Sequence, residues 1–132
     1  MKKIAILYSG LALLLFGCPP DGDPIPPPTI KDQLIGTWRI NELEIDSEPR
    51  TINSQNQLTF KEDEMYTMTL PELSFFPRDG NWVLTNSDTK ISINDGEYTF
   101  NINSLEDKDL TLTLEYENFK EDPITYKLAL KK

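Results

Sequence analysis

The chain has 132 residues, of which 38% are apolar and 27% charged, enough for one domain with a single modest core. Its 22 acidic and 13 basic residues give a formal net charge of −9, which repels phosphate backbones, so we expect no nucleic-acid partner. With no histidine and one cysteine, the chain lacks the commonest general base, Cys/His zinc sites and internal disulfides. We therefore expect a monomer with no metal, no cofactor and no enzymatic activity.

The N-terminal segment places Lys2 and Lys3 before an apolar run over residues 4–16, followed by the small residue Gly17. This run of 13 residues is shorter than the roughly 20 that a membrane-spanning helix needs. A short basic region before a short apolar region is typical of a secretory signal peptide. We expect residues 1–17 to be such a peptide and to be removed.

Leu15-Phe16-Gly17-Cys18 has the order aliphatic, variable, small, cysteine. This order is similar to the lipobox of bacterial lipoproteins, including small lipoproteins of Bacteroidetes. The resemblance implies that Cys18 carries fatty acyl chains such as palmitate. It also implies that the protein is anchored to the bacterial outer membrane, on the periplasmic face or the cell surface. Each buried CH₂ group contributes about 0.8 kcal/mol to such an anchor. In the alternative, the leader is an ordinary signal peptide and Cys18 has no special role.

Residues 18–28 are predicted to be a lipidated tether, because six of the ten prolines lie in residues 19–28. Proline-rich segments adopt extended polyproline II with a rise of about 3.1 Å per residue, so the tether would span about 30 Å. Asp21 and Asp23 follow Cys18 closely, a placement similar to the surface-export signal of Bacteroidetes lipoproteins. The Lys or Gln that usually precedes those acids is absent.

Residues 29–132 are predicted to form one domain that begins with a short helix. Thr29, followed three residues later by Asp32, makes a capping box for a helix over residues 29–35, which ends at Gly36. Beyond it, apolar and polar residues alternate, as in half-buried antiparallel strands. Asp95-Gly96 between two such runs indicates a hairpin. The predicted strands are residues 37–46, 57–61, 64–70, 81–86, 89–94, 97–104, 109–117 and 123–131.

The first predicted strand changes phase part-way along its length. Trp38 and Ile40 share one face, whereas Leu43 and Ile45 fall on the other, which predicts a bulge near residues 41–42. Eight sequential strands favour an all-β fold, an eight-stranded antiparallel up-and-down barrel, because closure removes exposed sheet edges. A two-sheet β-sandwich is the alternative.

Gly36-Thr37-Trp38, at the start of the first strand, resembles the first motif of lipocalins and related calycins. The resemblance implies that residues 30–132 form a lipocalin-like barrel, with the short helix plugging one end and Trp38 packed there. Lipocalins usually cover this tryptophan with an arginine from the last strand or just after it. The corresponding stretch here contains only lysines.

Candidate binding residues fall in the loops that we expect at the end opposite the helix. These loops are residues 46–56, 71–80, 95–96 and 118–122. They contain Phe75, Phe76 and Phe119 together with Arg50 and Arg78, a combination that suits an apolar ligand with an acidic head. In the alternative, Phe75 and Phe76 fold back and cap the core.

The predicted barrel interior is apolar, with Trp82, Phe100 and Leu112 among its inward-facing residues. Such residues either line a space for one small hydrophobic ligand or fill it by packing. The first case predicts a protein that binds or carries a small hydrophobic molecule. The second favours a protein-interaction or inhibitor module at the cell surface that uses the barrel rim around the phenylalanines.

Overall fold

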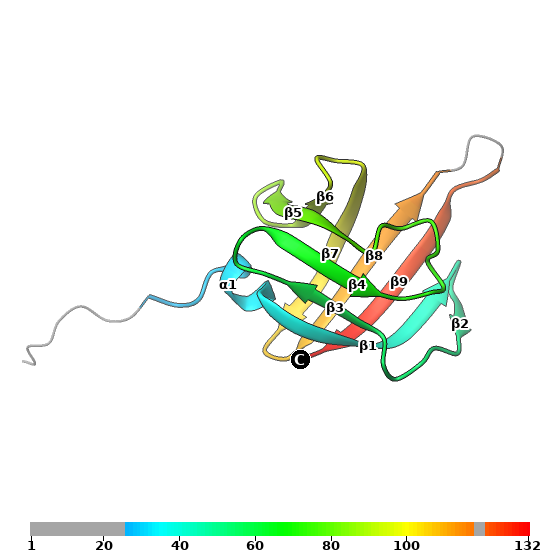
Figure 1. Cartoon of the computed structure of the whole chain (residues 1–132), viewed down its shortest axis with the longest axis horizontal. Helices are drawn as coiled ribbons and strands as arrows, with labels where there is room; N and C mark the ends of the chain where they lie inside the picture. The colour runs from blue at the N-terminus through cyan, green and yellow to red at the C-terminus, as the bar shows by residue number, and fades with distance from the viewer. Residues whose placement is uncertain (1–25, 118–120) are drawn as a thin grey trace, which may run out of the picture.

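The computed structural model of the chain describes residues 26–117 and 121–132 and consists of a β-barrel with one short helix across an end (Figure 1). Its elements are α1 (Ile30–Leu34), β1 (Gly36–Ile45), β2 (Glu48–Arg50), β3 (Gln57–Phe60), β4 (Met65–Thr69), β5 (Asp79–Thr85), β6 (Lys90–Ile93), β7 (Tyr98–Glu106), β8 (Asp109–Tyr116) and β9 (Ile124–Lys131). All eight predicted strands and the helix are present, with ends shifted by a few residues.

The barrel closes because β1 pairs with two different neighbours along its length. Its first residues, Gly36–Arg39, pair with β3, and its later part, from Arg39 to Ile45, pairs with β9. All pairings are antiparallel, so β1 and β3 to β9 form a closed eight-stranded barrel. The barrel prediction is confirmed, and the β-sandwich alternative is excluded.

Two local features of β1 explain its shape. The pairing with β9 shifts register between Ile40 and Glu42, which confirms the predicted bulge. As a result Trp38, Ile40 and Leu43 are all buried. The end of β1 also pairs with β2, a three-residue strand that the sequence analysis missed. Because β2 is exposed throughout and contains a proline, it has no alternating apolar pattern.

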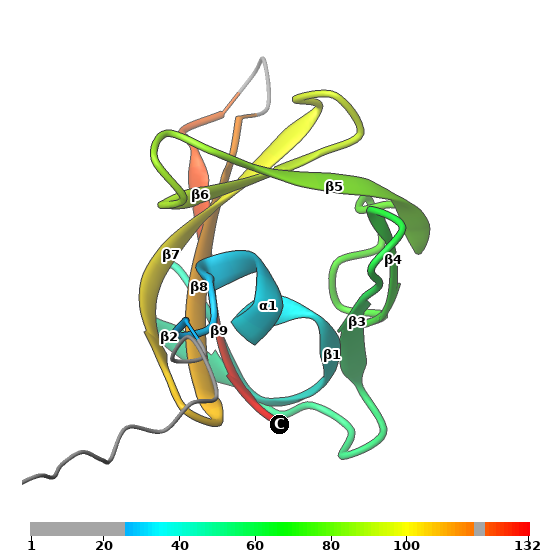
Figure 2. The ribbon, with the colours of Figure 1, turned by 90° about the vertical axis from the view of Figure 1, so that its left-hand side faces the viewer.

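The capping box predicted for α1 is present and fixes the start of the helix. The Asp32 backbone N–H donates to the Thr29 hydroxyl, and the Thr29 backbone N–H donates to the Asp32 carboxylate, both at 3.1 Å. The second bond, which the carboxylate accepts from the Thr29 backbone, lowers the pKa of Asp32. Leu34 is fully buried, so the helix lies across the barrel end seen in Figure 2 with one side chain inserted into the core.

Side chains from every strand except β2 fill the interior. The buried apolar residues form one cluster, and Trp82, Phe100 and Leu112 are at most 1% exposed. Among the described residues, Asn56 is the one buried polar residue. The predicted signal peptide, Cys18 and most of the tether lie outside the described residues, as does Phe119. Within the described part of the chain, no helix is long and apolar enough to cross a membrane.

Candidate functional site

The two ends of the barrel are built differently. The helix end carries α1 and the β3–β4, β5–β6 and β7–β8 connections; we call it the closed end. The other end, the open end, carries the β4–β5 connection, residues 70–78, which lies on the opposite side of the barrel from α1 in Figure 1. We call residues 70–78 the plug loop.

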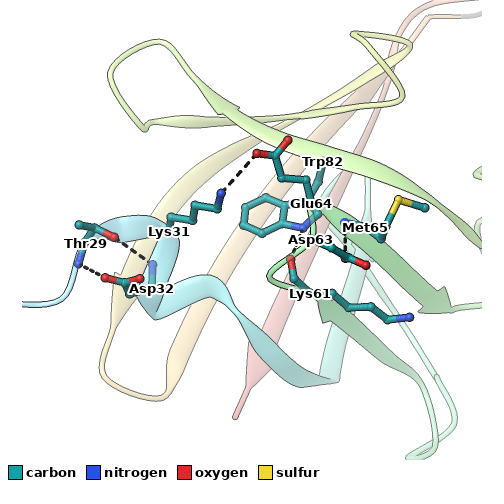
Figure 3. A network of polar contacts seen from close by, with 8 residues as sticks. All are labelled: Thr29, Lys31, Asp32, Lys61, Asp63, Glu64, Met65 and Trp82. Atoms are coloured by element: carbon teal, nitrogen blue, oxygen red, sulfur yellow. Dashed lines mark hydrogen bonds and ion pairs between the residues drawn. The ribbon is translucent and has the colours of Figure 1, made fainter.

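Polar contacts between separate elements fasten the closed end, as Figure 3 shows. Lys31 of α1 forms an ion pair with Glu64, with its Nζ 3.4 Å from Oε1. The same Nζ lies 6.0 Å from the centre of the Trp82 ring. Trp82 Nε1 donates a hydrogen bond of 3.2 Å to the Lys61 carbonyl. The helix is therefore tied to the β3–β4 turn and, through it, to β5.

Lys132 covers Trp38 at the closed end, in the place where lipocalins usually have an arginine. Its Nζ lies 5.0 Å from the centre of the Trp38 ring and donates to the carbonyls of Gln33 (2.8 Å) and Ile35 (2.6 Å). Burial lowers the pKa of this lysine. Trp38 Nε1 in turn donates to the Leu34 carbonyl at 2.8 Å.

Gly36 is required at the turn between α1 and β1. Its φ of +130° is one that residues with a side chain rarely adopt. A Cβ at this position would also lie 2.6 Å from Cε of Lys132. Gly36 therefore makes the turn from α1 into β1, and Trp38, two residues later, is fully buried at the closed end.

At the open end, the plug loop folds back over the core. Phe76 is 4% exposed, and its ring centre lies 4.9 Å from that of Tyr98, 5.3 Å from Phe100 and 6.0 Å from Tyr66. Leu73, in the same loop, is 1% exposed. The structure therefore has the arrangement in which these phenylalanines cap the core.

Phe75 has a different environment from Phe76, because it is half-buried and surrounded by tyrosines. Its ring is stacked on that of Tyr116, with centres 4.1 Å apart and planes at 27°. The rings of Tyr126 and Tyr98 lie at 5.3 Å and 5.9 Å. We call Tyr98, Tyr116 and Tyr126 the tyrosine cage; its members come from β7, β8 and β9.

Two tyrosine hydroxyls hold the backbone of the plug loop. Tyr66 donates to the Pro77 carbonyl at 2.9 Å, and Tyr98 donates to the Phe75 carbonyl at 3.2 Å. Burial, followed by the nearby acidic residues, raises the pKa of both hydroxyls and that of Tyr126. These hydroxyls therefore stay protonated, and Tyr66 and Tyr98 remain donors, throughout the physiological pH range.

A cleft of about 420 Å³ lies within the bend of the plug loop. It is lined by Met68, Thr69, Leu70, Pro71, Leu73, Ser74, Phe76 and Arg78. The Met68 backbone N–H donates to the Arg78 carbonyl at 2.7 Å, which closes the base of the loop. The lining combines apolar side chains with the hydroxyl groups of Thr69 and Ser74 and the guanidinium of Arg78, and the volume lies in the range of small-molecule sites.

The structure brings some of the predicted binding residues together and separates others. Phe75, Phe76 and Arg78 share the plug loop, and Phe76 contacts Phe100. Trp82 lies at the closed end, and Leu112 is buried in the barrel core. Arg50 is on the exposed strand β2, where its Nη2 lies 3.6 Å from Glu48 Oε2, and it does not line the cleft.

The sequence analysis missed the tyrosine cage. The sequence feature that could have revealed the cage is the position of its three tyrosines, each near the end of a strand that lies at the open end of the barrel. Tyr98 begins β7, Tyr116 ends β8, and Tyr126 is the third residue of β9. In an up-and-down barrel these positions converge, but their contact with Phe75 also depends on the path of the plug loop.

A family model described as a lipocalin-like domain matches residues 34–112, more than half of the chain. The chain belongs to the lipocalin-like domain family. The lipocalin-like barrel fits ligand binding in general, and the match covers the plug loop and Tyr98. No curated protein matches the sequence. The described residues contain no group of three or more acidic, cysteine or histidine side chains placed to hold a metal ion.

Proposed function

We propose that this lipocalin-like protein binds a small hydrophobic ligand at the open end of its barrel, and that it has no enzymatic activity. The observation that carries the proposal is the plug loop, which holds two adjacent phenylalanines and borders the 420 Å³ cleft. Connections between strands are usually polar and surface-exposed, so a loop with this apolar content is suited to contact an apolar molecule.

The cleft lining suggests an apolar ligand with an acidic head. Met68, Leu70 and Phe76 supply apolar surface, and Arg78 supplies a guanidinium that binds carboxylate or phosphate groups in bidentate fashion. Arg78 is exposed, so a bound head group would remain near solvent while the apolar part enters the cleft. A fatty acid or a similar amphiphile has this chemistry.

The proposal includes anchoring to the bacterial outer membrane through acylated Cys18, on the periplasmic face or the cell surface. It is supported by the leader and by the Leu15-Phe16-Gly17-Cys18 motif. A Pro-rich tether would hold the barrel about 30 Å from the membrane, within reach of lipids and of molecules that cross the envelope. Expression of the full chain in a bacterium tests the anchor, since wild type should gain acyl mass that the Cys18→Ser variant lacks.

A protein-interaction or inhibitor module at the rim is the second candidate. The filled interior favours it, because Trp82, Phe100 and Leu112 leave no exposed surface inside the barrel. Against it, the two rim phenylalanines that the structure describes are turned inward, since Phe76 is buried and Phe75 is half-buried. Ligand binding at the plug loop therefore ranks first.

Native mass spectrometry of residues 26–132 with decanoate tests the ligand-binding proposal. This segment contains the closed barrel, the helix and all the contacts described. We expect one bound decanoate in wild type, and weaker binding in Arg78→Gln but not in Arg50→Gln, a matched arginine outside the cleft. Absence of binding to wild type by decanoate and by ring-bearing hydrophobes would overturn the proposal.

A further inference from the structure

The ring of Phe75 occupies a site that belongs to other elements. Its three ring neighbours, the tyrosine cage, come from the last three strands of the chain, β7, β8 and β9, whereas Phe75 lies between β4 and β5. Tyr98 and Tyr116 are also stacked on each other, with centres 6.4 Å apart and planes at 26°. The cage is therefore a slot in which the phenyl group of Phe75 stacks on Tyr116, while the rings of Tyr98 and Tyr126 are each tilted by 48° to it.

Phe75 is attached to this slot more weakly than the rest of the plug loop is attached to the core. Phe76 and Leu73 are almost completely buried, whereas Phe75 is half-buried. Apart from ring contacts, one hydrogen bond from another described residue holds Phe75, donated by the Tyr98 hydroxyl to its carbonyl at 3.2 Å. That bond uses the backbone, so the ring can leave the slot without breaking it.

Apart from the packing of Leu73 and Phe76, few hydrogen bonds among the described residues tie the rest of the loop to the barrel. Besides the bonds from Tyr66 and Met68, the Asn56 side chain contacts Glu72, with Nδ2 3.4 Å from Oε2. The closed end, in contrast, is fastened by α1, Lys132 and both tryptophans. Local opening is therefore expected at the open end, since a segment held by few hydrogen bonds opens before one that several elements fasten.

We propose that the tyrosine cage is a binding subsite for a planar aromatic group of the ligand, and that Phe75 occupies the subsite until the ligand displaces it. The inference rests on the proposed function and adds the class of ligand. The slot already accommodates a flat six-membered ring at stacking distance, and aromatic faces favour offset stacking or tilted contacts with another ring. A flexible alkyl chain would make fewer such contacts.

Displacement has a consequence for affinity. A ligand that needs the slot binds only the fraction of molecules in which Phe75 has left it, so its apparent affinity is reduced by that fraction. Removal of the Phe75 ring should therefore strengthen the binding of an aromatic ligand. A ligand held only in the cleft, which neither Phe75 nor the tyrosine cage lines, should respond much less.

The probes are 1-naphthoate and decanoate, which carry the same charge and similar numbers of carbon atoms but differ in shape. Binding to residues 26–132 is measured by NMR titration, with phenylalanine rings labelled and the Phe75 signal assigned from Phe75→Leu. In wild type we expect naphthoate to bind at least tenfold more tightly than decanoate. It should also move the Phe75 ring signals from their stacked positions to those of a solvent-exposed ring.

Two variants complete the test. Phe75→Ala should bind naphthoate at least tenfold more tightly than wild type does, with a smaller change for decanoate. Val83→Ala, a change at an exposed position on β5, should leave both affinities as they are. Equal affinities of wild type for the two probes, or bound naphthoate with unmoved Phe75 signals, would overturn the cage subsite but leave the proposed function intact. Failure of wild type to bind either probe would overturn the proposed function itself, and the cage subsite with it.

Discussion

Replacement of Tyr66 by phenylalanine removes one hydroxyl and nothing else from the plug loop's support. The Tyr66 side chain is fully buried, and its hydroxyl donates to the Pro77 carbonyl at 2.9 Å. A hydrogen bond of this kind contributes about 0.5–1.5 kcal/mol to stability. Pro77 is half-buried, so water can partly replace the lost donor. We therefore expect Tyr66→Phe to lower the free energy of unfolding by about 1 kcal/mol at pH 7.

The same variant should behave differently at alkaline pH. Burial, followed by the charges of Asp79 and Glu97, raises the folded-state pKa of Tyr66 above its ordinary value of 10.0. The unfolded chain therefore loses this proton at a lower pH than the folded one. The stability that neutral Tyr66 provides is complete below pH 10 and is lost as the pH rises above it. Because the variant has no such group, its deficit relative to wild type should narrow above pH 10.

Urea denaturation followed by tryptophan fluorescence measures both effects. With a slope of about 2 kcal/mol per molar urea, the expected loss at pH 7 shifts the midpoint by about 0.5 M. Tyr116→Phe is the matched control, since among the described residues no hydrogen bond from its hydroxyl is present, and its stability should change by less than about 0.5 kcal/mol. An unchanged midpoint for Tyr66→Phe at pH 7, or a deficit that stays constant above pH 10, would refute the reasoning.

Three further substitutions test the core and the closed end by thermal or chemical denaturation. Phe100→Ala should lower the free energy of unfolding by about 3–5 kcal/mol, because it leaves a cavity in a filled barrel. A decrease of less than about 1 kcal/mol would contradict close packing of the interior. Gly36→Ala should lower the free energy of unfolding by about 1–3 kcal/mol through its φ of +130°. Gly96→Ala isolates the cost of a positive φ, because a Cβ there would meet its nearest neighbour, Ser92 Oγ, at an ordinary 4.0 Å. Lys132→Met should lower the free energy of unfolding by about 1–2 kcal/mol, because it removes two hydrogen bonds to the carbonyls of Gln33 and Ile35 and the cation over Trp38. Equal stability of the Lys131→Met and Lys132→Met variants would contradict this role of Lys132.

The barrel could be predicted from the sequence because each of its eight strands has a local pattern of alternating apolar and polar residues. Alternation of the type seen from Leu110 to Leu114 indicates a strand with one buried face, and the phase change between Ile40 and Leu43 indicates the bulge. The capping box at Thr29 depends on residues three apart and is equally local. β2 was missed because its three residues are all exposed.

The site was less predictable because it depends on contacts between distant residues. Lys132 contacts Trp38 and the end of α1, which lie nearly 100 residues earlier in the sequence. No local sequence pattern predicts such a contact for a lysine. The tyrosine cage requires three strands in register and a loop that turns inward. The sequence indicated residues 71–80 as a candidate binding loop, but two outcomes for Phe75 and Phe76 were compatible with it.

Native-state hydrogen exchange of ligand-free residues 26–132 is the most direct test of the central claim, that the barrel opens at the plug loop and not at the helix end. The informative amides are those of Leu73 and Phe76, which donate to carbonyls within the plug loop at 3.0 Å, and that of Trp82, which donates to the Glu64 carbonyl at 2.8 Å. We predict that the Leu73 and Phe76 amides exchange through a local opening well below the free energy of global unfolding, while the Trp82 amide exchanges only on global unfolding. Equal protection of all three amides would show that the plug loop does not open independently, and would contradict ligand entry at this end.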